Sequence, residues 1–184
     1  MAPNAAGTRR RDPHRRERIV AAAVAVIGEV GLAGFTHRAV AARADVPLGS
    51  TTYYFADLDE LLDAAVRTVA EENVQRLRDW ALALPDDADL SSELARFAVR
   101  LVTKHREATV LAYELYGAAL RRPALRAAST AWDTMLTEVF QSRFDPVTAR
   151  ALTALFDGLL YQALVSPRTP RRAELEPVLR RLLV

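Results

Sequence analysis

The sequence predicts an all-α protein in which a small N-terminal helical domain precedes a larger helical one. Alanine, leucine, valine, arginine and glutamate dominate the 184 residues, and only seven residues are glycine. This composition favours helix over strand. No stretch shows the two-residue alternation of a half-buried strand. Capping residues and prolines recur between the apolar runs, and they divide the chain into about nine helices.

The first helix is predicted from Pro13 to Val30. Asp12-Pro13 is typical of a helix start, and Gly31 ends the apolar pattern. One helical face collects the apolar side chains of Ile19, Ala23, Val26, Ile27 and Val30. Arginines before an apolar run also outline a secretory signal. The amphipathic spacing and the short length of the run, which ends at Gly28, favour a folded helix instead.

Two short helices with a sharp corner between them are predicted next. The first runs from His37 to Ala44 with Thr36 as its N-cap, and the second runs from Leu48 to Tyr54. Pro47 disfavours helical geometry at Val46, so the chain must turn there. Two short helices that meet at a tight corner, with an earlier helix to pack on, predict a helix-turn-helix.

The remaining chain is predicted to form six further helices. Asp57 and Glu60 have the spacing of a capping box at the start of a long helix. The six predicted ranges are 58–84, 91–104, 107–120, 123–144, 146–165 and 172–183. We therefore expect a flexible basic tail at 1–12, a helix-turn-helix domain at 13–57 and a larger helical domain at 58–184.

The composition argues against catalysis. The chain has no cysteine, and its three histidines are far apart, so thiolate chemistry is excluded and no metal-binding spacing is present. It also lacks a Gly-rich phosphate loop and a G-x-S-x-G motif. We expect no enzyme activity, no catalytic residue, no metal and no cofactor. No run reaches the roughly 20 apolar residues of a membrane span, and we expect a cytoplasmic protein without a membrane partner.

The basic front of the chain and the second short helix indicate double-stranded DNA as a partner. Residues 1–55 hold eight arginines and four acidic residues, which favours attraction to phosphates. The second helix of a helix-turn-helix enters the major groove with its N-terminal end. Gly49 lets the backbone approach phosphates, Ser50 and Thr51 can bond bases or phosphates, and Leu48 can touch a thymine methyl group. The candidate DNA-binding residues are Thr36, Arg38, Leu48, Gly49, Ser50, Thr52, Tyr53 and Tyr54.

These stretches resemble the DNA-binding domain of the TetR family of bacterial transcriptional regulators. The resemblance lies in an Ala-rich first helix, then GLAGFTHRAVAARADV, LGSTTYYF and DELL, and it covers about a quarter of the chain, from Ile19 to Leu62. It implies DNA contacts at the candidate residues other than Leu48. It also implies that the helices after the long one form a variable domain that binds a small ligand and dimerises.

Three positions depart from the family pattern. Asp45 replaces the usual glycine at the corner, Thr52 stands where a tyrosine is common, and Leu58 stands where the family often has a lysine. The missing lysine removes one expected phosphate contact. We therefore expect the N-terminal arginines to contribute more to DNA binding here.

The predicted helix 146–165 is apolar nearly all round, apart from a few residues such as Asp157, Tyr161 and Gln162. A surface helix would show a polar face, so this helix should be covered on more than one side. We expect one side of this helix to pack on its own domain and the other side to pack on a second copy of the chain. The apolar residues of the helix at 172–183 would add to the same interface. The alternative is that a single core within one chain covers the helix on all sides. A homodimer would present two helix-turn-helix domains to a palindromic DNA site.

Aromatic side chains on the later helices predict a small-molecule site for an apolar or amphipathic ligand. The candidate ligand-binding residues are Tyr113, Tyr116, Trp132 and Tyr161. Glu114 would favour a cationic ligand if it points inward. The resemblance implies a dimeric repressor that a small molecule releases from a palindromic operator by favouring another conformer. The alternatives are a DNA-binding regulator or architectural protein with no ligand, and a helical enzyme.

Overall fold

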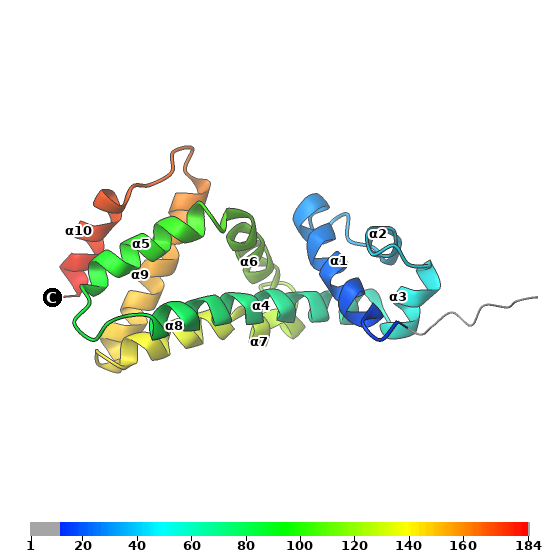
Figure 1. The fold of residues 1–184 in the computed structure, drawn as a ribbon, viewed down its shortest axis with the longest axis horizontal. Helices are drawn as coiled ribbons and strands as arrows, with labels where there is room; N and C mark the ends of the chain where they lie inside the picture. The colour runs from blue at the N-terminus through cyan, green and yellow to red at the C-terminus, as the bar shows by residue number, and fades with distance from the viewer. Residues whose placement is uncertain (1–11, 184) are drawn as a thin grey trace, which may run out of the picture. The chain divides into compact units, whose positions relative to one another are not determined.

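The computed structural model describes residues 12–183, and all regular structure in that range is helical (Figure 1). The predicted all-α class is therefore confirmed. The chain divides into two compact units, one that ends at Leu61 and one that begins at Leu62. The expected basic tail at 1–12 lies outside the described residues, apart from Asp12.

The smaller unit contains α1 (Arg15–Val30), α2 (His37–Arg43) and α3 (Leu48–Tyr54). The first helix begins two residues later than predicted, after an Asp12 side chain that accepts the His14 N–H at 3.0 Å. Gly31 follows its last residue with a φ of 67°, the left-handed geometry that favours glycine. The core of the unit is apolar and includes the buried Ile19, Ala23, Ile27, Phe35, Val40, Ala41 and Phe55.

Backbone hydrogen bonds fix the corner between α2 and α3. The Val46 N–H donates to the Ala41 carbonyl at 3.0 Å, and the Asp45 N–H donates to the Ala42 carbonyl at 3.3 Å. These two bonds form a Schellman motif, in which a left-handed residue ends the helix. Asp45 is that residue, with a φ of 51°. Aspartate tolerates this geometry better than most residues, which explains how the corner forms without glycine.

The long helix α4 (Leu58–Leu82) begins at the end of the smaller unit and continues into the larger one. Its start is capped as predicted: Asp57 accepts the Glu60 N–H at 2.8 Å, and Glu60 accepts the Ala56 N–H at 2.7 Å. The larger unit continues with α5 (Leu90–Val102), α6 (Arg106–Ala118), α8 (Ala131–Gln141), α9 (Pro146–Val165) and α10 (Arg172–Leu182).

The single helix predicted at 123–144 is divided in the structure. It forms a 3-10 turn η1 (Pro123–Leu125), the short helix α7 (Arg126–Ser129) and then α8. At the junction, the Thr130 hydroxyl donates to the Arg126 carbonyl at 2.9 Å. Such back-bonding to the preceding turn commonly bends helices. The division places Trp132 and Asp133 in the first turn of α8.

The core of the larger unit lies between α5, α8, α9 and the end of α4. The helices α8 and α5 both pack on α9, and α10 packs on α5 (Figure 1). Phe97 is central, since its ring stacks on Trp80 at 4.7 Å and on Phe156 at 6.2 Å between centroids. No helix among the described residues is both long and apolar enough to cross a membrane.

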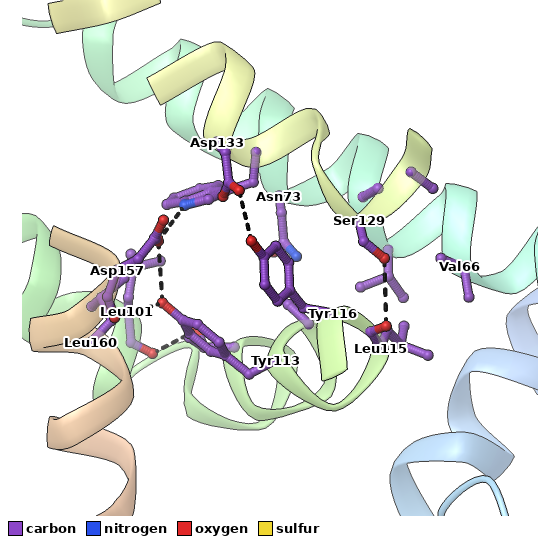
Figure 2. Close-up of a pocket in the computed structure, with 16 residues that line it drawn as sticks. Val66, Asn73, Leu101, Tyr113, Leu115, Tyr116, Ser129, Asp133, Asp157 and Leu160 are labelled. Carbon is purple, nitrogen blue, oxygen red and sulfur yellow. Dashed lines mark hydrogen bonds between the residues drawn. The ribbon is translucent and has the colours of Figure 1, made fainter. Parts of the chain in front are cut away.

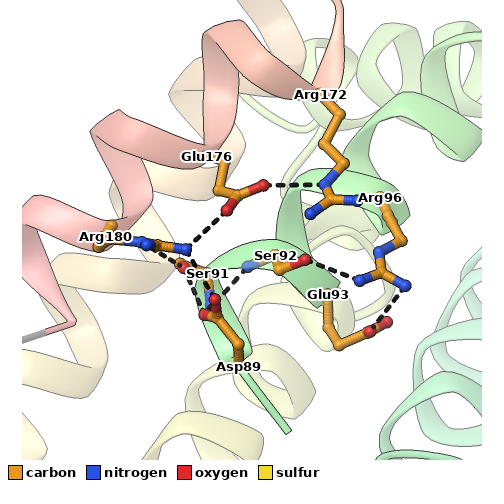
Figure 3. Close-up of polar contacts among 8 residues, drawn as sticks. All are labelled: Asp89, Ser91, Ser92, Glu93, Arg96, Arg172, Glu176 and Arg180. Carbon is orange, nitrogen blue, oxygen red and sulfur yellow. Dashed lines mark hydrogen bonds and ion pairs between the residues drawn. The ribbon is translucent and has the colours of Figure 1, made fainter.

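Polar contacts join α10 to the start of α5 (Figure 3). Asp89 caps α5 by accepting the backbone N–H groups of Ser91 and Ser92. From α10, Arg180 donates to Asp89 at 2.7 Å and to Glu176 at 2.6 Å. The Asp89 carboxylate therefore caps the N-terminus of α5 and also binds the neighbouring helix α10.

Candidate functional site

The outer face of α3 carries most of the predicted DNA-binding side chains. Thr52 and Tyr53 are exposed, and Tyr53 is 68% exposed. Leu48 and Gly49 are exposed at the start of the helix, whereas Ser50 and Tyr54 are half-buried. The rings of Tyr53 and Tyr54 meet edge to face with centroids 5.1 Å apart. Hydroxyl, aromatic and backbone groups are thus presented together on one short helix.

Thr51 lies on the opposite face of α3 and is fully buried. Its hydroxyl donates to the Leu48 carbonyl at 2.8 Å. The interpretation of Thr51 as a DNA contact is therefore wrong. The sequence contains a sign that Thr51 is buried, because residues four apart lie on the same face of a helix and Phe55 is buried.

The start of α2 supplies the other two predicted DNA-binding residues, Thr36 and Arg38, which are both exposed. Thr36 caps α2, and its hydroxyl oxygen accepts the Ala39 N–H at 3.1 Å. Arg43, at the end of α2, pairs with Glu29 of α1 at 3.2 Å. The positions of α1 and α2 are thus tied by an ion pair, while Arg38 is directed to solvent.

A cavity of about 120 Å³ lies inside the larger unit (Figure 2). Its walls come from α4, α5, α6, α7, α8 and α9, and they are mostly apolar. Three of the four predicted ligand-binding residues, Tyr113, Tyr116 and Trp132, line it. The fourth, Tyr161, is not a lining residue: it is 57% exposed, and its ring packs edge-on against Tyr113 at 5.8 Å.

Asp157 is the central polar group of the cavity. It accepts a hydrogen bond from the Trp132 indole N–H at 2.9 Å and another from the Tyr113 hydroxyl at 3.3 Å (Figure 2). Burial and, next, the charge of Asp133 raise the pKa of Asp157 to about 7. Burial also raises the pKa of Tyr113, so this phenol stays a neutral donor.

Asp133 is the second carboxylate of the cavity. It accepts the Tyr116 hydroxyl at 3.0 Å, and this hydrogen bond raises the pKa of the phenol. None of the described residues that line the cavity is basic. Glu114 is exposed and is not a lining residue, so it does not supply the inward charge considered for it. The cavity instead offers two carboxylates among aromatic rings.

The two carboxylates differ in how visible they are in the sequence. Asp157 interrupts an apolar helix, which made it visible as a polar group, although its role was not assigned. Asp133 stands in a region predicted as uninterrupted helix, and nothing local distinguished it. No group of side chains in residues 12–183 has the composition and proximity needed to hold a metal ion.

A groove on the outside of the larger unit lies between α4, α7 and the start of α8. Asp63, Arg67 and Glu71 are among the charged residues that line it. Ala70 and Ala128 line both this groove and the cavity.

The side of α9 that faces away from the core carries an exposed apolar stripe. Its members are spaced three or four residues apart and are Val147, Ala151, Ala154, Gly158, Tyr161 and Val165. Val147 and Val165 are 79% and 70% exposed, and a Cβ added at Gly158 would meet no atom within 4 Å. On α10, Val178 and Leu182 form a shorter exposed stripe.

Two family descriptions match most of the chain. Residues 19–65 match "Bacterial regulatory proteins, tetR family", and residues 85–184 match "Tetracyclin repressor-like, C-terminal domain". The chain is 29% identical over 175 residues to the HTH-type transcriptional regulator BetI 2 of Chromohalobacter salexigens, with 89% of this chain and 84% of that protein covered.

Solved structures resemble the chain along nearly its whole length. The multidrug binding protein EbrR in complex with imidazole is 47% identical with a TM-score of 0.83, covering 94% of this chain and 97% of EbrR. A TetR-family member from Streptomyces coelicolor A3, SCO1917, is also 47% identical with a TM-score of 0.83, covering 94% and 99%. The helix-turn-helix, the helical second unit and these matches agree: the chain belongs to the TetR family, and it is a DNA-binding transcriptional regulator rather than an enzyme.

Proposed function

We propose that the protein is a dimeric repressor that an aromatic cation releases from a palindromic operator. The observation that carries the ligand part is the pair of carboxylates, Asp133 and Asp157, among aromatic rings in a cavity without a basic lining residue. A positive, flat molecule matches both the charge and the walls of such a cavity. Because DNA is the partner, we place the protein in the cytoplasm.

The proposed DNA-binding domain spans residues 13–57. Its DNA contacts are Thr36, Arg38, Leu48, Gly49, Ser50, Thr52, Tyr53 and Tyr54, as predicted from the sequence. Their exposure on α2 and α3 supports this assignment. Arg38 would supply phosphate attraction, and the α3 hydroxyls would read base edges or fix the register on the backbone.

The proposed ligand-binding and dimerisation domain spans residues 58–184. Tyr113, Tyr116 and Trp132 would contact the ligand, while Tyr161 would act at most through Tyr113. EbrR, which is 45–47% identical to this chain in these comparisons, has been solved with ethidium, proflavin and malachite green. Each of these three molecules is an aromatic cation, which supports the same ligand class here.

The exposed stripe on α9 supports self-association. Apolar side chains at helical spacing along a whole helix are expected to be covered by a partner, and a twofold copy would bring the same stripe to itself. Gly158 and the nearby alanines would allow close approach. The short stripe on α10 would extend the contact.

The proposed response is a shift between two conformers. A ligand releases DNA only if it binds the released conformer more tightly than the DNA-bound one. Helix α4 is the covalent link, because it contributes Val66, Val69, Ala70 and Asn73 to the cavity and follows α3 after three residues. A ligand that changes the position of α4 can therefore change the position of the DNA-binding domain.

The test is selection of bound sequences from random duplex DNA, followed by titration of the selected DNA with ethidium. We expect one short palindrome to be enriched and ethidium to weaken its binding, after correction for ethidium bound to free DNA. Tyr53→Ala should weaken DNA binding and leave ethidium binding unchanged. Enrichment without any effect of ethidium, proflavin or malachite green would support a regulator that does not respond to aromatic cations. No enrichment would contradict the proposal entirely.

A further inference from the structure

The two carboxylates of the cavity lie on different helices and line the same space inside the larger unit. Asp133 belongs to the first turn of α8, and Asp157 belongs to the middle of α9. Both line the same cavity, and the charge of Asp133 is one of the causes that raise the pKa of Asp157. Each also has a phenol donor from α6, Tyr116 for Asp133 and Tyr113 for Asp157 (Figure 2).

The other groups around this pair do not neutralise two negative charges. Helix α4 presents the Asn73 amide, whose oxygen already accepts a hydrogen bond from Arg76. Arg76 itself is not a lining residue, and α5 contributes only Leu101 to the wall. On α9, Tyr161 packs on Tyr113 without lining the cavity. Two ionised carboxylates without a cation in a mostly apolar site would repel each other strongly.

We propose that Asp157 holds a proton before ligand binds, and that an aromatic cation binds by displacing this proton into solvent. This inference rests on the proposed function and adds its regulation by pH. The total charge of the site then stays constant on binding, because one positive charge enters as another leaves. The phenols of Tyr113 and Tyr116 and the Trp132 indole remain as neutral donors to the carboxylates.

The exchange makes ligand affinity depend on pH with a defined sign. Asp157 has a pKa of about 7, so it is protonated at pH 5.5 and ionised at pH 8.5. A fixed cation that binds only the ionised site should have a Kd that falls roughly 30-fold between these pH values and levels off above neutrality. Isothermal titration of ethidium at pH 6.5, in buffers of different ionisation enthalpy, should show release of most of one proton.

Two variants should move the midpoint of this pH profile in opposite directions. Asp133→Asn removes the neighbouring negative charge and should move the midpoint to lower pH. Trp132→Phe removes a donor that stabilises the Asp157 carboxylate and should move the midpoint to higher pH. Asp157→Asn should bind ethidium weakly at every pH. A merely structural role of these residues would change affinity without moving the midpoint.

A ligand-free measurement separates this inference from the proposed function. A carboxyl with a raised pKa in the folded state makes the protein less stable as pH rises from about 4 to about 7. Asp157→Asn should therefore raise the melting temperature more at pH 8 than at pH 5. An equal effect at both pH values, or ethidium binding with a constant Kd and no proton release, would overturn the proton on Asp157 and leave the repressor proposal standing. The expected pH-dependent change in melting temperature, together with no ethidium binding at any pH, would overturn both the aromatic cation as the ligand class and the exchange of proton for ligand.

Discussion

Two adjacent threonines on α3 show how position on a short helix decides the role of a side chain. Thr51 is buried and donates to the Leu48 carbonyl, whereas Thr52 is exposed and its hydroxyl lies 3.3 Å from the Gly49 carbonyl. The same chemical group therefore supports the fold at one position and is exposed to solvent at the next, where we propose a contact with DNA.

The pair Thr51→Val and Thr52→Val tests this difference with one chemical change. Thr51→Val should lower the free energy of unfolding by about 1 kcal/mol, because it removes a buried hydrogen bond. Thr52→Val should leave unfolding unchanged and weaken binding to the selected DNA. Chemical denaturation and fluorescence anisotropy measure the two effects. The assignment is wrong if both variants lose stability equally or if Thr52→Val binds DNA as the wild type does.

Asp45 tests whether the corner between α2 and α3 depends on left-handed geometry. Asp45→Val should destabilise the protein by about 1–2 kcal/mol, because a β-branched side chain is poorly accommodated at positive φ. Asp45→Gly should stay within about 0.5 kcal/mol of the wild type, since relief of strain is offset by greater freedom of the unfolded chain. Thermal denaturation of both variants decides the matter; equal losses would mean that the side chain of Asp45 acts in another way.

At the scale of the elements, local signals predicted the helix boundaries well. Thr36 and Asp57 are predicted as capping residues, and Asp145 directly precedes the predicted helix at 146–165; each accepts a backbone N–H group at the start of its helix. These bonds join residues two or three apart, so the sequence alone contains them. The break at Thr130 was missed because a threonine that bonds the preceding turn looks the same in sequence as one that does not. The carboxylates of the cavity reach the same space through the packing of α8 on α9, which no local pattern encodes.

Two kinds of interaction join α5 and α10, the cap at Asp89 and the ion pairs of Arg180, and their contributions to stability should depend differently on salt. Asp89→Ala should lower the melting temperature, and this loss should persist in 1 M NaCl because capping of backbone N–H groups is short-ranged. Arg180→Ala should cause a smaller loss that disappears at high salt, since its ion pairs are exposed. Arg181→Ala, at the exposed neighbouring position, is the control.

The pH dependence of the Asp89 cap follows from its hydrogen bonds. The Ser91 hydroxyl and the helix N–H groups hold the pKa of Asp89 below its ordinary 3.8. Its contribution is therefore present above pH 3.8 and lost as the pH falls through the lowered value. The difference in melting temperature between wild type and Asp89→Ala should shrink on acidification; a constant difference would contradict capping by the ionised carboxylate.

At the scale of the whole molecule, the stripe on α9 predicts how the chain associates. Gly158→Leu adds bulk where the single chain has open space, so it should preserve helicity while weakening the proposed dimer. Gly117→Leu makes the same change at an open position on α6, outside the stripe, and should leave association unchanged. Sedimentation velocity measures both. Dimers of equal strength in the two variants would show that α9 is not the interface.

The two alanines common to the cavity and the outer groove have a kinetic consequence. Ala70 and Ala128 line both the cavity and the groove, and alanine has no rotamer that could swing aside. Passage of a flat molecule at this place would involve displacement of α7, a four-residue helix with no buried side chain. For a ligand that enters there, the rate of entry would depend on that short helix, separately from the affinity of the cavity.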